Sequence, residues 1–426
     1  MRQLAQTPAP NGSPRQGPLR LVLSLPAALA QRFRRAGDPD THSAVHAMTT
    51  EELGRRLTLT VISGHPDRVD LAHHLKPAIR DWQAQDWDNL GQRIARLDSR
   101  HATLPSGERV ATALGQALFR HIIGPKVCQM IDRGQSVTTS ELPEQLFAPL
   151  ARALARTETQ PSIHFLAAQI NLETGWARRG DDFTEFALED AIFAAQARFR
   201  VARNILDQIA SRAPHSAYFS ELDYRVRAAE GTTEDELTRA ALRWTRTDPT
   251  ALTPFSVHGM HLLPRWYGAE GSLGQFANRV WSKTRETLGA AGYAATYLSA
   301  MEVHPPAVLS CDIDTLREGL IDMMQQSADP DLTCNTVLRT LWEVGTEGYG
   351  TDGRDTTALR RARRDLRQLF CYLARNTLGP VMPDVWGRGW TETRILRALA
   401  EAFEDDITRG RDIAIGLDGA VVGAAA

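Results

Sequence analysis

The hydrophobic positions of this chain recur with the spacing of an α-helix along most of its length. The clearest stretch is 185–212, where apolar residues follow the i, i+3, i+7 spacing that places them on one helix face. They are Ile192, Ala195, Phe199, Ala202, Leu206 and Ile209. Alternation typical of strands is scarce, and its best candidate, residues 57–62, fits a helix equally well. The pattern therefore predicts an all-α protein.

Polar residues at two positions predict where helices begin. Thr49 and Glu52 have the spacing of a capping box, and apolar residues follow them at helical intervals. Asp312 and Asp314 resemble the aspartate pair of phosphoryl-transfer enzymes, but no hydrophobic strand precedes them to hold a nucleophile. We therefore expect one of the two to cap a helix whose apolar face starts at Leu316.

A repeating unit is visible in the middle of the chain. Pro214 and Pro249 each follow a predicted helix and are about 35 positions apart. Two apolar stripes lie between them, and after Pro249 helices are expected near 255–266 and 272–289. A helical pair of about 34 residues is the tetratricopeptide period, and such pairs bury their apolar faces by stacking. The sequence predicts an α-solenoid of tetratricopeptide-like helical hairpins, although the usual W-x-x-L-G-x-x-Y opening is missing.

Two short blocks also resemble a known family. Leu262–Gly268, continuing to Gln275–Ala277, resembles the L-x-P-R-W-G-G-S…F-A block of a bacterial family of unknown function with tetratricopeptide-like repeats. Gly175–Gly180 resembles that family's W-x-x-R-G block. The similarity covers about 77–300 and extends loosely to about 400, and the chain departs from it at Tyr267 and Ala269, where the family more often has small residues. The resemblance implies a helical solenoid and implies no activity.

The pattern divides the chain into five regions. We expect a disordered, basic and proline-rich leader, an N-terminal helical region, tetratricopeptide-like repeats, a C-terminal helical region and a flexible tail. Their ranges are 1–48, 49–160, 161–300, 301–411 and 412–426.

The leader allows a second interpretation. It has no acidic residue before Asp38, and a short apolar run at Leu19–Ala30 resembles a signal peptide. We expect a cytoplasmic protein, with export as the alternative if residues 1–30 are a signal peptide.

Composition narrows the classes of function. The chain has 426 residues with 49 basic and 51 acidic side chains, and its arginines are spread along its length, so no nucleic-acid partner is expected. No run reaches the roughly 18 apolar residues of a membrane span. The four cysteines lack metal-ligand spacing and suit a reducing compartment.

Three groups of residues are candidates for binding. Arg178 and Arg179 precede Gly180, a glycine suited to ending a helix, and their charges fit the helix dipole. Arg265 and Trp266 are interpreted as a wedge between repeats in which the arginine stacks on Trp266 or Trp281, with a ligand pocket as the alternative.

The third group lies on the predicted helix 356–376, whose non-buried sides carry Arg360, Arg361 and Arg364 among other arginines. A solvated face is the default interpretation. The alternative is a docking surface for an acidic partner or a phosphate backbone, although aromatic residues for base stacking are lacking.

Candidate chemistry is sparse. His258 and His261 have a spacing compatible with two metal ligands on one helix face, but packing histidines are the favoured interpretation. Nucleophile-elbow and H-E-x-x-H motifs are absent. We expect a helical interaction or scaffold protein with a protein or peptide partner, no catalytic residue and no cofactor. The alternative is a metal-binding protein or enzyme using His258 and His261. The oligomeric state stays open.

Overall fold

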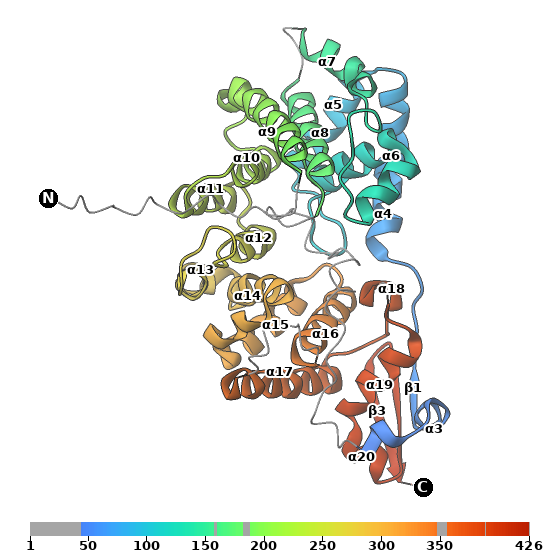
Figure 1. The fold of residues 1–426 in the computed structure, drawn as a ribbon. Coiled ribbons are helices and arrows are strands. Elements are labelled where there is room, and N and C mark those ends of the chain that lie inside the picture. The colour runs from blue at the N-terminus through green and yellow to red at the C-terminus, as the bar shows by residue number, and fades with distance from the viewer. Residues whose placement is uncertain (1–43, 157–159, 182–187, 347–355, 388, 426) are drawn as a thin grey trace, which may run out of the picture.

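The computed structural model describes residues 44–156, 160–181, 188–346, 356–387 and 389–425 (Figure 1). Most of these residues are helical, which confirms the predicted helical class, and a small three-stranded sheet is added to the helices. Residues 1–43 of the expected leader, including the possible signal peptide, lie outside the described residues. None of the described helices is both long and apolar enough to cross a membrane.

The upper part of the molecule in Figure 1 is formed by residues 66–247. Its elements are α4 (Pro66–Gln83), α5 (Trp87–Ser99), α6 (Val110–Asp132), the 3-10 helix η1 (Glu144–Phe147), α7 (Ala148–Leu154), α8 (Pro161–Arg179), α9 (Glu189–Ile209), the 3-10 helix η2 (Ala210–Arg212), α10 (Ala217–Glu230) and α11 (Glu234–Thr247). Helix α6 kinks at Gly124, where φ is 78°, just before Pro125.

The lower part combines the first described residues with the second half of the chain, as Figure 1 shows. Its elements are α2 (Ala44–Ala47), α3 (Thr50–Arg56), β1 (Leu57–Leu59), α12 (Thr253–His261), α13 (Ser272–Leu288), α14 (Ala291–Val303), the 3-10 helix η3 (Pro305–Ser310), α15 (Ile313–Gln326), α16 (Pro330–Thr346), α17 (Thr357–Asn376), α18 (Pro383–Trp386), α19 (Glu392–Ala402), α20 (Glu404–Thr408), β2 (Arg411–Gly416) and β3 (Gly419–Ala425).

The predicted helix starts are confirmed. The side chain of Thr49 accepts a hydrogen bond from the backbone N–H of Glu52, and the Glu52 carboxylate accepts one from the Thr49 backbone, so the capping box is complete. Asp312 caps α15 by accepting from Thr315 N–H at 2.8 Å. Each cap satisfies N–H groups that the first helical turn cannot pair by itself.

The periodic pattern also placed the helices of the central region well. Helix α9 spans Glu189–Ile209 within the predicted 185–212, and five of its six stripe residues, from Ala195 to Ile209, are buried. Helices α12 and α13 lie where 255–266 and 272–289 were expected, although α12 is shorter, ending at His261. Local periodicity was sufficient here because each helix buries one continuous stripe.

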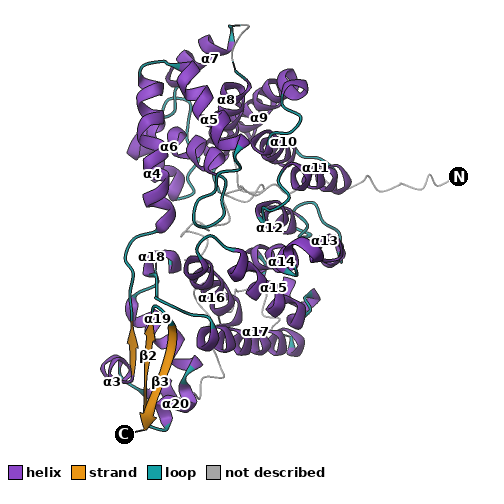
Figure 2. Cartoon of the chain, turned by 180° about the vertical axis from the view of Figure 1, so that it is seen from behind, coloured by secondary structure: helices purple, strands orange, loops and turns teal. Residues whose placement is uncertain are grey.

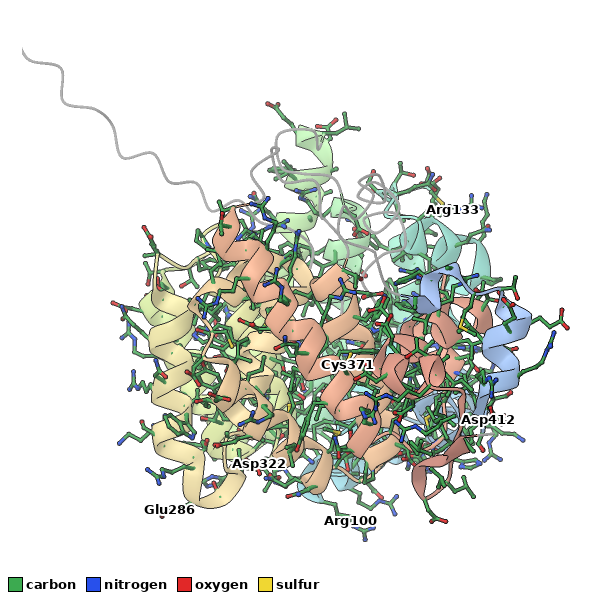
Figure 3. All side chains as sticks on the ribbon, turned by 90° about the horizontal axis from the view of Figure 1, so that it is seen from below. Arg100, Arg133, Glu286, Asp322, Cys371 and Asp412 are labelled. Atoms are coloured by element: carbon green, nitrogen blue, oxygen red, sulfur yellow. The ribbon has the colours of Figure 1, made fainter. Side chains whose placement is uncertain are left out.

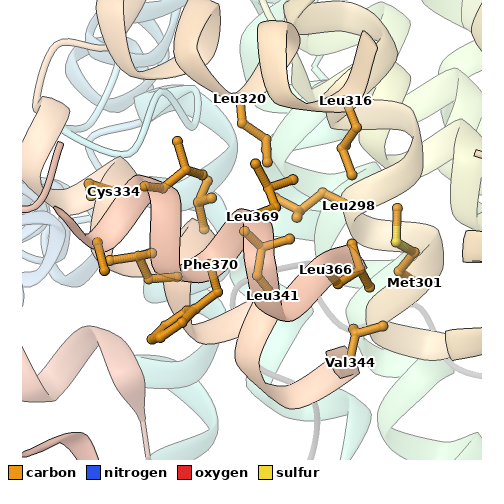
Figure 4. Close-up of a cluster of buried hydrophobic side chains, with 14 of the residues drawn as sticks. Leu298, Met301, Leu316, Leu320, Cys334, Leu341, Val344, Leu366, Leu369 and Phe370 are labelled. Carbon is orange, nitrogen blue, oxygen red and sulfur yellow. The ribbon is translucent and has the colours of Figure 1, made fainter. Parts of the chain in front are cut away.

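The two parts have separate hydrophobic clusters. One takes its buried residues from Ala78 to Ala229, and the other from Val45–Leu57 together with Phe255–Ile415. Figure 4 shows part of the second, where side chains of α14, α15, α16 and α17 meet. The predicted region boundaries at 160/161 and 300/301 fall inside these two clusters.

Both ends of the described chain correct the sequence expectation. Residues 44–47, assigned to the disordered leader, form α2, and Val45 is 2% exposed. Residues 412–425, expected to be a flexible tail, form most of the hairpin of β2 and β3 (Figure 2). The two-residue turn that joins these strands is followed by Gly419, whose φ of 107° favours glycine.

The sheet explains why the tail prediction was wrong. Strand β2 pairs in parallel with β1, with Leu57 opposite Ile413 and Leu59 opposite Ile415. Ile413 and Ile415 are buried against helices of the lower part, whereas the intervening residue is exposed. The segment 412–425 is ordered because Ile413 and Ile415 are buried and because β2 pairs with β1, a strand from the other end of the described chain. Its small, apolar side chains gave no local sign of this order.

Candidate functional site

Helix α17 presents a basic face to solvent. Thr356 caps its start, and residues such as Leu366 and Phe370 are fully buried on the inner side. Arg360, Arg361 and Arg364 are exposed, and none of them makes an ion pair with a residue in the described part of the chain. Figure 3 shows α17, marked by Cys371, lying across the face of the molecule seen from below.

The same helix uses another arginine for internal structure. Arg367 donates to the Glu401 carboxylate of α19 at 2.8 Å, so its charge is compensated within the protein. The exposed set continues along the helix at intervals of four residues through Gln368 to Tyr372, which is 46% exposed. We call Arg360, Arg361, Arg364, Gln368 and Tyr372 the α17 outer face.

Arg178 and Arg179 lie in the last turn of α8, as predicted, and the helix ends at Gly180 with φ of 68°. The two arginines are 6% and 5% exposed, so they are buried and do not form a cluster on the surface. Arg178 Nη2 lies 3.5 Å from the Glu144 carboxylate of η1, and Arg198 of α9 contacts the same carboxylate. Burial lowers the pKa of both Arg178 and Arg198.

Sequence reasoning missed Arg198 and Glu144. Arg198 is one of several arginines on α9, and its Nη1 also donates to Asn171 Oδ1 at 3.2 Å. Glu144 is an ordinary acidic residue in a loop by sequence. No local signal could have joined them, because α8, α9 and η1 meet only through tertiary packing.

Arg265 stacks on Trp266, which is one of the two ring partners that the sequence predicts. Its guanidinium carbon lies 4.5 Å from the ring centroid, and Trp266 packs against the lower hydrophobic cluster. Burial lowers the pKa of Arg265, and the Arg265 charge in turn adds to the burial that lowers the pKa of His304. This arrangement fits the predicted wedge, and the described residues around it give no separate argument for a ligand.

His258 and His261 are packing residues within a buried hydrogen-bond network. They are 0% and 3% exposed, and their Nδ1 atoms lie 3.0 and 2.7 Å from the Tyr224 hydroxyl. His258 Nε2 also lies 3.0 Å from the Thr238 hydroxyl. Burial lowers the pKa of each histidine to about 3, so both rings are neutral. The described residues contain no group of three or more side chains that could hold a metal ion.

A buried polar layer, which sequence reasoning also missed, lies between α6, α8 and α10. The Thr112 hydroxyl donates to Glu221 at 2.6 Å, and Arg225 pairs with Glu221 at 2.5 Å. Gln169 donates from Nε2 to the Thr112 carbonyl at 3.0 Å and accepts a hydrogen bond from the Tyr218 hydroxyl at Oε1. We call these five residues the polar layer. Its three members on α10, Tyr218, Glu221 and Arg225, lie three and four residues apart on one helix face, and two of them are charged, so the face has no apolar stripe.

Glu108 borders the polar layer at the start of α6. Its buried Oε1 atom has no hydrogen-bond partner in the part of the chain that the structure describes. Burial raises the pKa of Glu108 to about 8, and the nearby Glu221 charge adds to this, while Arg225 opposes it. The Glu108 carboxyl is therefore protonated at neutral pH.

Comparison of the chain with protein-family models, curated proteins and solved structures finds no match.

Proposed function

We propose that this chain is a non-catalytic helical-repeat interaction protein that binds an acidic protein or peptide through the α17 outer face. We further propose that it is related to the bacterial tetratricopeptide-like family that its two sequence blocks resemble, and that its helices stack as tetratricopeptide-like hairpins.

The arrangement of the central helices supports the repeat hypothesis. Helices α10 and α11 are joined by a short turn at Gly231 and pack on each other, and α11 packs on α12. Helices α12 and α13 are joined by the turn near Gly268–Gly271 and also pack together. Successive pairs that contact their neighbours are the arrangement by which repeats build an extended binding surface.

The observation that carries the binding hypothesis is the uncompensated charge of Arg360, Arg361 and Arg364. Many arginines of the described chain pair with a carboxylate of the same chain, as Arg367 does. Three exposed guanidinium groups close together without such partners favour carboxylates supplied by another molecule, with affinity that falls as salt rises. Tyr372 adds an exposed aromatic ring of the kind enriched at interfaces.

The cysteines fit the cytoplasmic location proposed from the sequence. Cys128, Cys311, Cys334 and Cys371 are all free thiols, and burial raises the pKa of each. Protonated, unpaired thiols suit a reducing compartment.

A charge-reversal experiment tests the binding hypothesis. The triple variant R360E/R361E/R364E should lose most of its affinity for a labelled oligoglutamate peptide, measured by fluorescence anisotropy at low salt, because attraction becomes repulsion. A matched control reverses three exposed cations of α13, Arg279, Lys283 and Arg285, which lie on another helix. The control should bind like the wild type, and both variants should keep the helical circular dichroism spectrum.

Two results would contradict the proposal. One is equal loss in both triple variants, which would reduce the effect to net charge. The other is absence of salt-sensitive oligoglutamate binding by the wild-type protein. A labelled DNA duplex measured in parallel tests the phosphate-backbone alternative, and binding tighter than that of oligoglutamate would favour it.

A further inference from the structure

We propose that Arg178 and Arg198 form a binding site for a phosphate group, and that the carboxylate of Glu144 occupies this site when no phosphate is bound. The inference is independent of the α17 outer face, since it concerns the opposite part of the molecule.

The geometry brings two arginines to one carboxylate. Arg178 comes from the last turn of α8 and Arg198 from the facing side of α9, two helices that pack closely together. Both reach Glu144, the first residue of η1. Within the described part of the chain these two positive charges share one carboxylate, which leaves the pair short of anionic compensation.

The hydrogen bonding of Arg178 is also incomplete. The side chain is 7% exposed, and its buried Nε and Nη2 atoms have no hydrogen-bond partner among the described residues. The 3.5 Å separation from Glu144 is a charge contact and too long for a good hydrogen bond. Buried N–H groups of a cation are costly to leave unpaired, so an oxyanion that reaches them gains more than it would from an exposed arginine.

Arg198 is held ready for such a contact. Asn171 accepts from Arg198 Nη1 and donates from its own Nδ2 to the Ala167 carbonyl at 2.8 Å. This second bond fixes the orientation of the amide, so that the Asn171 oxygen faces the guanidinium group. Asn171 is therefore a positioning residue for Arg198.

Glu144 is well placed to leave. Its side chain is 58% exposed, and it lies at the start of a four-residue 3-10 helix that contributes no buried residue. Turning the carboxylate outward would expose no hydrophobic surface and would return the charge to water. An incoming anion competes with the Glu144 carboxylate for the two arginines. The apparent affinity of the protein for the anion is therefore reduced to the share that molecules with Glu144 turned away can provide.

A phosphate monoester or inorganic phosphate matches the pair better than a second carboxylate does. A phosphate group carries up to two negative charges at neutral pH and has at least three unesterified oxygens, so it can compensate both guanidinium groups. The bidentate geometry of arginine suits phosphate as well as carboxylate.

The test titrates inorganic phosphate, O-phosphoserine and acetate into the full chain at constant ionic strength, followed by isothermal titration calorimetry. We expect saturable binding of phosphate, weaker binding of acetate, and about tenfold tighter phosphate binding by Glu144→Gln, because the internal competitor loses its charge. Glu189→Gln removes one exposed negative charge near the start of α9 and should change nothing. Binding of phosphoserine would show that the site accepts a monoester, and its failure beside bound phosphate would restrict the ligand to the free anion.

Arg198→Gln provides the loss-of-binding variant, because Arg178 is more deeply buried and its replacement risks unfolding. Phosphate binding should weaken at least tenfold in Arg198→Gln, with the thermal midpoint in the absence of phosphate kept close to that of the wild type. The proposal is overturned if neither the wild type nor Glu144→Gln binds phosphate saturably, or if Arg198→Gln binds it as the wild type does. In that case the contacts of Glu144 are a structural link between η1 and the α8–α9 pair.

Discussion

The upper and lower parts of this molecule build their interiors in different ways. Between α6, α8 and α10 the polar layer crosses the helix interfaces and includes the Glu221–Arg225 ion pair. Between α14, α15, α16 and α17 most of the equivalent space is filled by leucine, valine, methionine and phenylalanine (Figure 4), although the buried Glu302 of α14 pairs with Arg339 of α16. The polar layer is therefore sensitive to charge and pH, and the apolar core around α17 is sensitive to side-chain volume.

The largest effect is expected where a buried ion pair in the upper part is broken. Arg109, at the start of α6, donates through its Nε and Nη2 atoms to Asp248, which is 1% exposed. Arg109→Ala leaves this carboxylate buried without its cation and should cost about 3–5 kcal/mol of unfolding free energy. Denaturant unfolding measures the loss, with Arg361→Ala on the exposed side of α17 as the control, expected within about 0.5 kcal/mol. Equal losses of unfolding free energy in the two variants would show that the buried Arg109 contributes no more to stability than the exposed Arg361 does.

A volume change should give the next largest effect, in the lower part. Leu366 is fully buried on α17, and Leu366→Ala should cost about 2–4 kcal/mol through lost burial and the cavity left behind. This loss should be independent of pH between 5 and 9, because no titratable group is involved. Gln368→Ala, two residues away on the exposed side, is the matched control. A marked pH dependence of the Leu366→Ala effect would contradict the description of this core as apolar.

The smallest effect is a gain, and it sharpens the electrostatic half of the comparison. The pKa of Glu108 rises from 4.5 to about 8 on folding, so the folded state takes up a proton between these values. The stability that depends on this proton is complete below pH 4.5, falls as pH rises, and is lost above about pH 8. Glu108→Gln keeps the neutral shape and should stabilise the protein at pH 8, because glutamine requires no proton uptake on folding.

The pH series decides this prediction. The gain of Glu108→Gln should shrink as pH falls towards 5, because the wild-type carboxyl is then protonated at little cost. Thermal unfolding midpoints of both proteins across this range provide the measurement. A gain that does not change with pH would show that folding does not raise the pKa of Glu108.

Much of the helical structure could be predicted because its causes are local. The stripe of α9, the caps at Thr49 and Asp312, and the turn before α13 all depend on residues a few positions apart. The exposed position of Arg360, Arg361 and Arg364 followed from the same periodicity. The hairpin of β2 and β3 could not be predicted in this way, because β2 is ordered by pairing with β1 from the other end of the described chain.

The same distinction between local and tertiary causes applies to the candidate sites. The sequence by itself determined which residues lie on which side of each helix, since a repeat of 3.6 residues sorts buried from exposed positions without reference to other helices. Tertiary structure alone decided which polar residues meet. It placed Glu144 between Arg178 and Arg198, joined His258 and His261 through Tyr224, and set Glu108 beside Glu221. Charge and hydrogen bonding act over a few ångströms in space, and the order of residues along the chain does not encode those distances.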